Sequence, residues 1–365
     1  MATNIGLPAL TLAFKAAAKT VANRTKRGVA AVIVRDTAAL GVHVLRTAAQ
    51  IPSTLGAANQ ALIESVFTGS DRGMPSQVIA LVISSASGEN TALADGLSLL
   101  AGHSIDYLAG PADADAGELT AIAAWVKAQR AAYRTVKLVR PVGSSGSDDM
   151  GIIDVEETGA YSGDTAVSAG ALCFRLAGIL AGIPMGESST YAALPEITAV
   201  TERTTAQQNT AISNGKLILI HDGLQAKIAR GVNSLVTIPS EGKEDWSKIK
   251  IVEGMDLITY FLRTTIENDY MGRYPNLYDN KQLLVAAVSD YFTELEKAGV
   301  LSPGESYAQV DYNAQLAWMQ AQGVDTSTMT EQQIRTYQTG SYVFLAYGGR
   351  LVDAMEDFQG TFTNL

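Results

Sequence analysis

Apolar and polar positions follow two patterns along the first two thirds of the chain. Continuous apolar runs of strand length lie at residues 28–34, 76–84, 106–110, 135–141 and 152–157. Stretches with helical spacing lie between them, at residues 54–67, 90–102 and 116–133. Strands that alternate with helices are typical of an α/β layer built on a mainly parallel sheet. We therefore expect an α/β fold for this part of the chain.

The pattern changes in the second half of the chain. Residues 166–185 predict a long helix rich in Ala and Gly, and residues 215–231 predict two strands joined by a tight turn at Asp222-Gly223. We place a domain boundary near Trp246, followed by a strand at residues 248–253. Apolar residues at helical spacing then predict two helices, an α+β arrangement. The first helix carries Met255, Ile258, Leu262, Ile266 and Tyr270, and the second carries Leu284, Val288, Tyr291 and Leu295 and ends at Gly299.

Both ends of the chain carry a strand pattern without a local partner. In "GLPALTLAFKAAAK" (residues 6–19), Leu10, Leu12 and Phe14 alternate with smaller or polar residues, as in a half-buried strand. No turn signal follows that would bring back a second strand. Residues 352–365, after the break at Gly348-Gly349, are again strand-like. Because an unpaired apolar strand is prone to pair with another chain, these segments predict contacts with other molecules.

Composition and charge narrow the function. The chain has 365 residues, of which 47% are apolar and 18% charged, as in a globular protein. Its net charge of −10 argues against a nucleic-acid binder, which needs clustered positive charge. Residues 1–30 contain only basic charges, and residues 351–365 contain only the acids Asp353, Glu356 and Asp357. We expect Lys15 and Lys19 to face acidic surface, and these three acids to face basic or neutral surface, on neighbouring molecules.

No membrane or disulfide role is expected. The most apolar stretch, residues 166–185, carries Arg175 at its centre, which would cost about 2.5–3.5 kcal/mol in a bilayer. Lys15 interrupts the apolar run near the start, so we expect no secretory signal. The single cysteine, Cys173, lies between Leu172 and Phe174 and is interpreted as a buried structural thiol.

A search for catalytic motifs yields no catalytic, cofactor-binding or metal-binding residues. The chain has no P-loop string, and His43, His103 and His221 lack metal-ligand spacing. "GSSGS" (residues 143–147) lacks the strand context of a nucleophile elbow. Two alternatives stay open at this point. One is an α/β hydrolase or nucleotide-binding enzyme with a degenerate site, and the other is a subunit of a different oligomeric shell.

An ordered set of long segments resembles the tail sheath family of contractile phages and related contractile injection systems. These segments are residues 6–36, 177–202, 215–223, 231–237, 246–258, 278–301 and 339–358. The likeness is greatest to the compact sheaths of Gram-positive phages and phage-tail-like bacteriocins. Such a set of segments is more specific than any short motif.

The resemblance implies a structural subunit and not an enzyme. Sheath subunits stack as hexameric rings in a helical tube around an inner tail tube, with baseplate and tail terminator proteins as further partners. They are assembled in the bacterial cytoplasm, become part of a virion or bacteriocin particle, and contract to drive the tube through a target envelope. No cofactor, nucleic acid or membrane insertion is implied.

The resemblance also implies a division of the chain. It predicts an N-terminal arm at residues 1–25, an α/β domain at 26–245, a C-terminal domain at 246–350 and a C-terminal arm at 351–365. The arms of neighbouring subunits add strands to a sheet in each C-terminal domain. The expected inter-subunit contacts are Leu10, Leu12, Phe14, Lys15, Val352, Met355, Phe358 and Phe362. The expected hinges are Gly6, Gly28, Gly348 and Gly349.

Overall fold

The computed structural model describes residues 28–85, 91–143, 146–238 and 244–363. Contacts between residues divide the chain into two compact units. We call residues 28–256 with 353–363 the sheet unit, and residues 257–352 the helical unit. The division falls within one helix, α7 (Ile249–Thr265), whereas the sequence placed a boundary near Trp246. Each unit is described by itself.

A seven-stranded sheet forms the centre of the sheet unit, with strand order β10-β6-β5-β4-β1-β3-β2. Every neighbouring pair in this sheet is parallel except β2 with β3, which confirms the predicted mainly parallel sheet. The strands are β1 (Val29–Asp36), β2 (Gly41–Leu45), β3 (Gln77–Ser84), β4 (Tyr107–Ala109), β5 (Lys137–Pro141), β6 (Ile152–Val155) and β10 (Lys216–Leu217).

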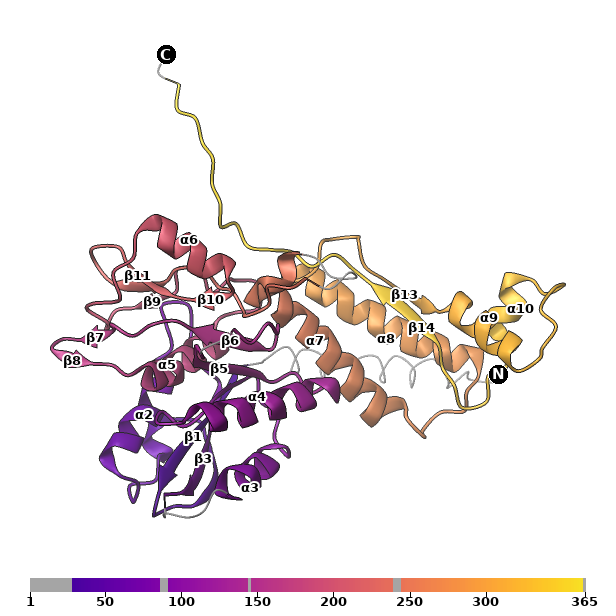
Figure 1. The fold of residues 1–365 in the computed structure, drawn as a ribbon. Coiled ribbons are helices and arrows are strands. Elements are labelled where there is room, and N and C mark those ends of the chain that lie inside the picture. The colour runs from indigo at the N-terminus through magenta and orange to yellow at the C-terminus, as the bar shows by residue number, and fades with distance from the viewer. Residues whose placement is uncertain (1–27, 86–90, 144–145, 239–243, 364–365) are drawn as a thin grey trace, which may run out of the picture. The chain divides into compact units, whose positions relative to one another are not determined.

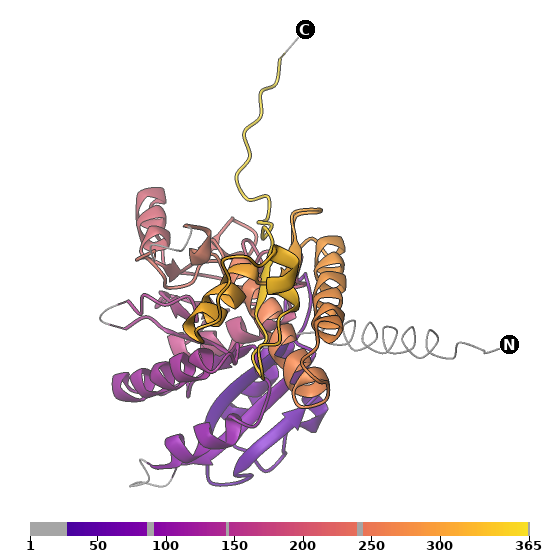
Figure 2. The ribbon, with the colours of Figure 1, turned by 90° about the vertical axis from the view of Figure 1, so that its right-hand side faces the viewer.

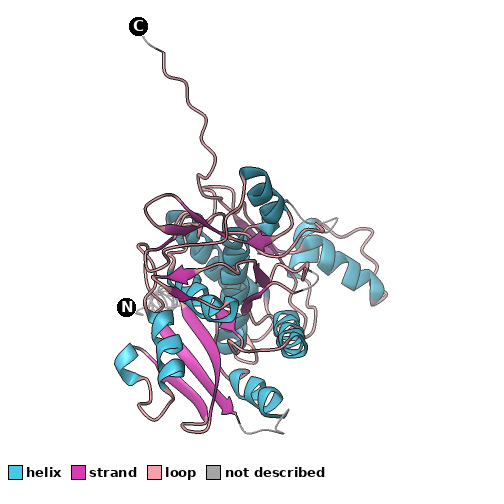
Figure 3. Ribbon diagram, turned by 60° about the vertical axis from the view of Figure 1, so that its left-hand side comes forward, coloured by secondary structure: helices cyan, strands magenta, loops and turns pink. Residues whose placement is uncertain are grey.

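Helices cover both faces of this sheet, as Figure 3 shows by colour. In β1, Ala30, Val32 and Val34 face a core that includes α2 (Ala57–Phe67) and α5 (Ala169–Gly182). The alternate residues, Ala31 and Ile33, face a second core with α3 (Thr91–Leu100) and α4 (Ala116–Ala131). Because both faces are buried, the strands are apolar at almost every position, which explains the continuous apolar runs in the sequence.

Smaller elements complete the sheet unit. The strands β11 (Leu219–His221) and β12 (Ala226–Ile228) form the predicted hairpin, and the Asp222 carboxylate accepts hydrogen bonds from the backbone of Leu224 and Gln225 in its turn. The remaining elements are η1 (Ala48–Gln50), β7 (Tyr161–Ser162), β8 (Thr165–Ala166), β9 (Ala193–Leu194), α6 (Thr205–Ser213) and η2 (Glu244–Ser247). Of these, β9 pairs with β12, and β7 pairs with β8.

The predicted strand at residues 248–253 is wrong, because Lys248 makes only an isolated bridge and residues 249–253 form the beginning of α7. Ile249, Ile251 and Val252 are all buried, so this short stretch of the helix is mostly apolar. A short apolar run of this kind also occurs in buried strands. Ionic contacts within the sheet unit fix this part of the helix. Lys137 of β5 lies 2.6 Å from Glu253 and 2.8 Å from Asp256, and Arg130 of α4 also binds Asp256.

The helical unit contains the rest of α7 and the long helix α8 (Tyr278–Lys297), both labelled in Figure 1. The predicted core residues of α8 are buried, and Tyr291 stacks on Phe261 with 3.6 Å between ring centroids. A two-stranded antiparallel sheet pairs β13 with β14. The other elements are η3 (Ile266–Tyr270), β13 (Tyr307–Val310), α9 (Tyr312–Ala321), α10 (Glu331–Thr336) and β14 (Leu345–Gly348). Among the described residues, no helix is both long and apolar enough to span a bilayer.

Candidate assembly interface

The expected contact residues fall into two groups. Gly6, Leu10, Leu12, Phe14 and Lys15 lie outside the described residues, so their predicted roles stay predictions. The C-terminal group lies within the described residues. There, the backbone N–H of Val352 donates to the carbonyl of Val300, next to an isolated bridge between Leu301 and Leu351.

Beyond Val352, residues 353–363 form neither helix nor strand, and Figure 1 and Figure 2 both show them as an extended chain. Three of the four expected contact residues of this end are open to solvent. Met355 is 86% exposed, Phe358 82% and Phe362 91%. Isolated apolar residues are common on protein surfaces, but three large ones on a short extended segment indicate a surface that binds a partner.

The acidic residues of the same segment bind other residues of the sheet unit. The side chain of Glu356 is only 6% exposed. Its Oε1 accepts hydrogen bonds from the hydroxyls of Ser188 and Thr190, each at 2.6 Å. Its Oε2 lies 3.1 Å from Nε of Arg230 and 3.5 Å from Nζ of Lys248. Both oxygens of this carboxylate are therefore held by donors or positive charge.

Two further ion pairs flank this contact. Lys248 binds the carboxylate of Asp353, and Arg230 donates to Asp357 at 2.6 Å. We call residues 353–357 with Ser188, Thr190, Arg230 and Lys248 the acidic clamp. In the isolated chain, basic residues of the same chain bind the three acids, and the expectation that these acids face a neighbouring molecule stays a prediction. These bases precede the segment by over a hundred residues, so local sequence gave no sign of the pairing.

Hydrogen bonds support the seat of the clamp, by which we mean Ser188, Thr190, Arg230 and Lys248. The guanidinium of Arg72 donates to the carbonyls of Ser188 and Thr190. The Thr190 hydroxyl accepts from the backbone N–H of Gly231 at 2.9 Å, which leaves its proton for Glu356. These hydrogen bonds tie Ser188 and Thr190 to the rest of the sheet unit without involving Glu356.

The clamp sets the protonation of Glu356. Burial raises the pKa of this carboxyl, but the hydrogen bonds from Ser188 and Thr190 and the charges of Lys248 and Arg230 outweigh burial. The pKa of Glu356 is therefore below its ordinary value. The hydrogen bond from Arg230 likewise lowers the pKa of Asp357. Both groups are carboxylates at neutral pH, as the ion pairs require.

The sheet of β13 and β14 in the helical unit has only two strands among the described residues. Tyr307 and Tyr347 on these strands are about half exposed. Gly348, an expected hinge, ends β14, and a Cβ there would lie 2.7 Å from the Tyr307 ring. A two-stranded sheet is marginally stable alone and gains stability from further strands.

The expected hinge Gly28 immediately precedes β1. Its φ of +118° lies in a region that side chains rarely adopt, and a Cβ would lie 2.9 Å from the carbonyl oxygen of Ala181. Its N–H donates to the buried carboxylate of Asp106 at 2.8 Å. The structure thus gives a local reason for glycine here, and the hinge role of Gly28 stays a prediction.

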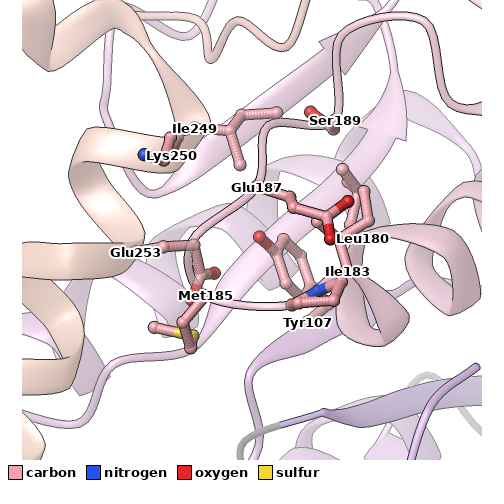
Figure 4. Close-up of a pocket in the computed structure, with 10 residues that line it drawn as sticks. Tyr107, Leu180, Ile183, Met185, Glu187, Ser189, Ile249, Lys250 and Glu253 are labelled. Carbon is pink, nitrogen blue, oxygen red and sulfur yellow. The ribbon is translucent and has the colours of Figure 1, made fainter. Parts of the chain in front are cut away.

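A pocket in the sheet unit bears on the alternative of an enzyme. Figure 4 shows it between Tyr107, Leu180 and Ile183 on one side and residues of α7 on the other. The Ser189 hydroxyl lines it, is buried and has no hydrogen-bond partner among the described residues. None of the three histidines lines this pocket, so it lacks the serine–histidine pair of a nucleophilic site. In the described part of the chain, no group of His, Cys, Asp or Glu has the geometry of a metal site.

Comparisons with known proteins agree with an assembly role. Residues 241–363 match the phage tail sheath C-terminal domain family. The tail sheath protein of Clostridium phage phiCD119 is 31% identical over 353 residues, which covers 96% of this chain and 98% of that protein. The chain therefore belongs to the phage tail sheath protein family, which confirms the resemblance seen in the sequence.

Solved structures share the fold. A sheath tail protein from Listeria innocua aligns with a TM-score of 0.68 at 15% identity, over 84% of this chain and 93% of that chain. The helical sheath of the anti-feeding prophage in its contracted state aligns with a TM-score of 0.67 at 14% identity, over 92% of this chain and 93% of that one. At these identities the likeness concerns the fold alone.

Proposed function

We propose that this protein is the structural subunit of a contractile tail sheath. Its subunits stack in hexameric rings around an inner tail tube, and the sheath shortens to drive the tube through a target cell envelope. The observation that carries this proposal is the relation to a phage tail sheath protein along almost the whole of both chains. The fold that this chain shares with the helical sheath of the anti-feeding prophage in its contracted state supports the proposal.

The subunits are linked by strand addition. Leu10, Leu12, Phe14 and Lys15 of one arm, and Val352, Met355, Phe358 and Phe362 of the other, contact neighbouring subunits. The exposure of Met355, Phe358 and Phe362 supports this, because these side chains bury little surface in their own chain. The two-stranded sheet of β13 and β14 is the acceptor. Each added backbone hydrogen bond contributes about 0.5–1.5 kcal/mol, and apolar contacts add more.

Strand addition between copies is a head-to-tail contact, which extends into a lattice and does not close into a dimer. Subunits tethered by their arms can rotate during contraction without separating. Gly6, Gly28, Gly348 and Gly349 are the positions at which we expect the chain to bend. Contraction itself relaxes a metastable extended lattice into a more stable one.

The further partners are the inner tube, baseplate and tail terminator proteins, and the protein is not an enzyme. The subunit is assembled in the bacterial cytoplasm and is carried in a virion or a bacteriocin particle. The relative's origin in a phage favours the virion.

Electron microscopy tests the proposal. We expect the purified protein, alone or with its tube partner, to form long hollow cylinders at high concentration. A chain with both ends intact that stays monomeric at every concentration and salt level would refute a sheath role. Sedimentation of the same samples separates cylinders from irregular aggregates.

A further inference from the structure

The seat of the acidic clamp has the features of a binding site. Four side chains from three separate segments, Ser188 with Thr190, Arg230 and Lys248, converge on one carboxylate. Two hydroxyl donors hold one oxygen and two cations face the other, so the charge and both acceptors of Glu356 are matched. Hydrogen bonds from Arg72 and Gly231 support the seat without involving Glu356.

The side-chain hydrogen bonds and ion pairs that hold residues 353–357 come from Asp353, Glu356 and Asp357. Met355, between the clamped acids, is 86% exposed, and Phe358 after them is 82% exposed. The segment therefore adds little apolar burial to its own unit. The carboxylate contacts decide whether it stays in place.

We propose that Ser188, Thr190, Arg230 and Lys248 form a binding site for acidic peptide segments, filled in the isolated chain by its own residues 353–357 and able to take the same residues of a second copy. Because both occupants make identical contacts, exchange changes the contact energy little. Effective concentration then decides between them. The role of exchange in an assembly rests on the proposed sheath function, but the binding site itself does not.

A peptide-binding experiment with the full-length chain tests the site. The probe is a fluorescent peptide of residues 353–357, which lacks Val352, Phe358 and Phe362 and keeps only Met355 of the contacts expected for strand addition. Binding is measured by anisotropy at concentrations where sedimentation shows a monomer. The wild-type chain should bind it weakly, because its own segment fills the site. The Glu356→Gln chain should bind it at least about tenfold more tightly, because its own segment is released.

The glutamine substitution is expected to release the segment for a chemical reason. An amide has no negative charge, and its NH2 group would place a donor against Nε of Arg230 or against the two hydroxyls. A peptide with the same Glu356→Gln change should therefore bind at least about tenfold more weakly than the wild-type peptide. Adding Arg230→Gln to the Glu356→Gln chain should abolish binding of the wild-type peptide.

Glu294→Gln on α8 is the matched control, because it makes the same chemical change at a side chain that is 54% exposed and pairs with Lys297, outside the clamp. The Glu294→Gln chain should bind the peptide as weakly as wild type. Equal binding by the wild-type and Glu356→Gln chains, or equal binding of the two peptides, would overturn the proposal. Failure of the wild-type protein to form cylinders would refute the sheath function and leave the peptide result standing.

Discussion

The largest sheet of the sheet unit and the sheet of the helical unit differ in completeness. The seven-stranded sheet of the sheet unit is covered by helices on both faces, and residues such as Leu108 and Ile33 are fully buried in it. In the described part of the chain, the sheet of β13 and β14 has two strands, with Tyr307 and Tyr347 about half exposed. The first sheet is stable through its own side chains, whereas the second has surface left to pair with other strands. Folding and assembly are thus expected to depend on different residues.

The largest effect is expected in the complete sheet. Leu108→Ala in β4 removes a fully buried side chain and should lower the free energy of unfolding by about 2–5 kcal/mol. Leu99→Ala on α3 makes the same chemical change at a side chain that is 56% exposed, and should change stability by about 0.5 kcal/mol or less. Thermal and denaturant unfolding of the two variants checks this. Equal losses would show that the cores do not carry the stability of the sheet unit.

A substitution in the N-terminal arm should prevent assembly and leave the stability of the subunit unchanged. Leu12→Pro removes a strand donor and distorts the backbone, so it should abolish cylinder formation. If this segment pairs only with a neighbouring subunit, the isolated subunit should melt near the wild-type temperature, because the two cores of the sheet unit are built from later residues. Leu12→Ala should be milder, since it keeps the backbone hydrogen bonds. If Leu12→Pro unfolds the subunit, this segment pairs within its own chain and the proposed exchange of arms is wrong.

Loss of an exposed aromatic residue at the other end should weaken assembly without preventing it. Phe358→Ser removes a side chain that is 82% exposed in the isolated chain. Burial of a Phe side chain against a neighbour contributes about 1.5–3 kcal/mol, so the concentration needed for cylinders should rise roughly tenfold or more. Thr361→Ser, a small change on the same segment, is the control. An unchanged assembly threshold for Phe358→Ser would remove this residue from the interface.

The sequence predicted the strands of the seven-stranded sheet better than the segment at residues 248–253. The apolar runs that became β1 and β3 are unambiguous, because a strand buried on both faces is apolar at nearly every position. The run at residues 248–253 was wrongly predicted as a strand for a related reason. Ile249, Ile251 and Val252 are all buried in the first turns of α7, and such short apolar runs do not distinguish a buried helix from a strand.

The acidic clamp could not be predicted, because it depends on tertiary contacts. The sequence shows three acids without a base at residues 351–365, and this suggested a neighbouring molecule as the partner. Arg230 follows β12 and Lys248 precedes α7, and only the fold brings them to Glu356. The resemblance to sheath proteins likewise gave no information on this site.

Acid should open the clamp and leave the seven-stranded sheet intact. Glu356 has a pKa below its ordinary value of 4.5, so its contribution is fully present above that value and is lost as the pH falls through the lowered pKa. A dye on Thr361→Cys would report release as a fall in anisotropy. Burial raises the pKa of the native Cys173 thiol, so labelling is selective. The Glu356→Gln variant should show low anisotropy at every pH, and a pH response equal to wild type would contradict the role of Glu356.

The smallest effect is expected from the charges of the N-terminal arm. Lys15 and Lys19 are basic residues in an arm that is otherwise without charge before Arg24. If they face acidic surface on a neighbour, Lys15→Glu with Lys19→Glu should raise the concentration needed for cylinders. Exposed ion pairs contribute only about 0–1 kcal/mol each, so the rise should be a few-fold and should fade as salt screens the charges. Light scattering across protein and salt concentrations measures both quantities, with Lys15→Gln and Lys19→Gln as the neutral control. Identical thresholds and salt dependence for the reversed and wild-type chains would show that strand pairing alone selects the docking edge.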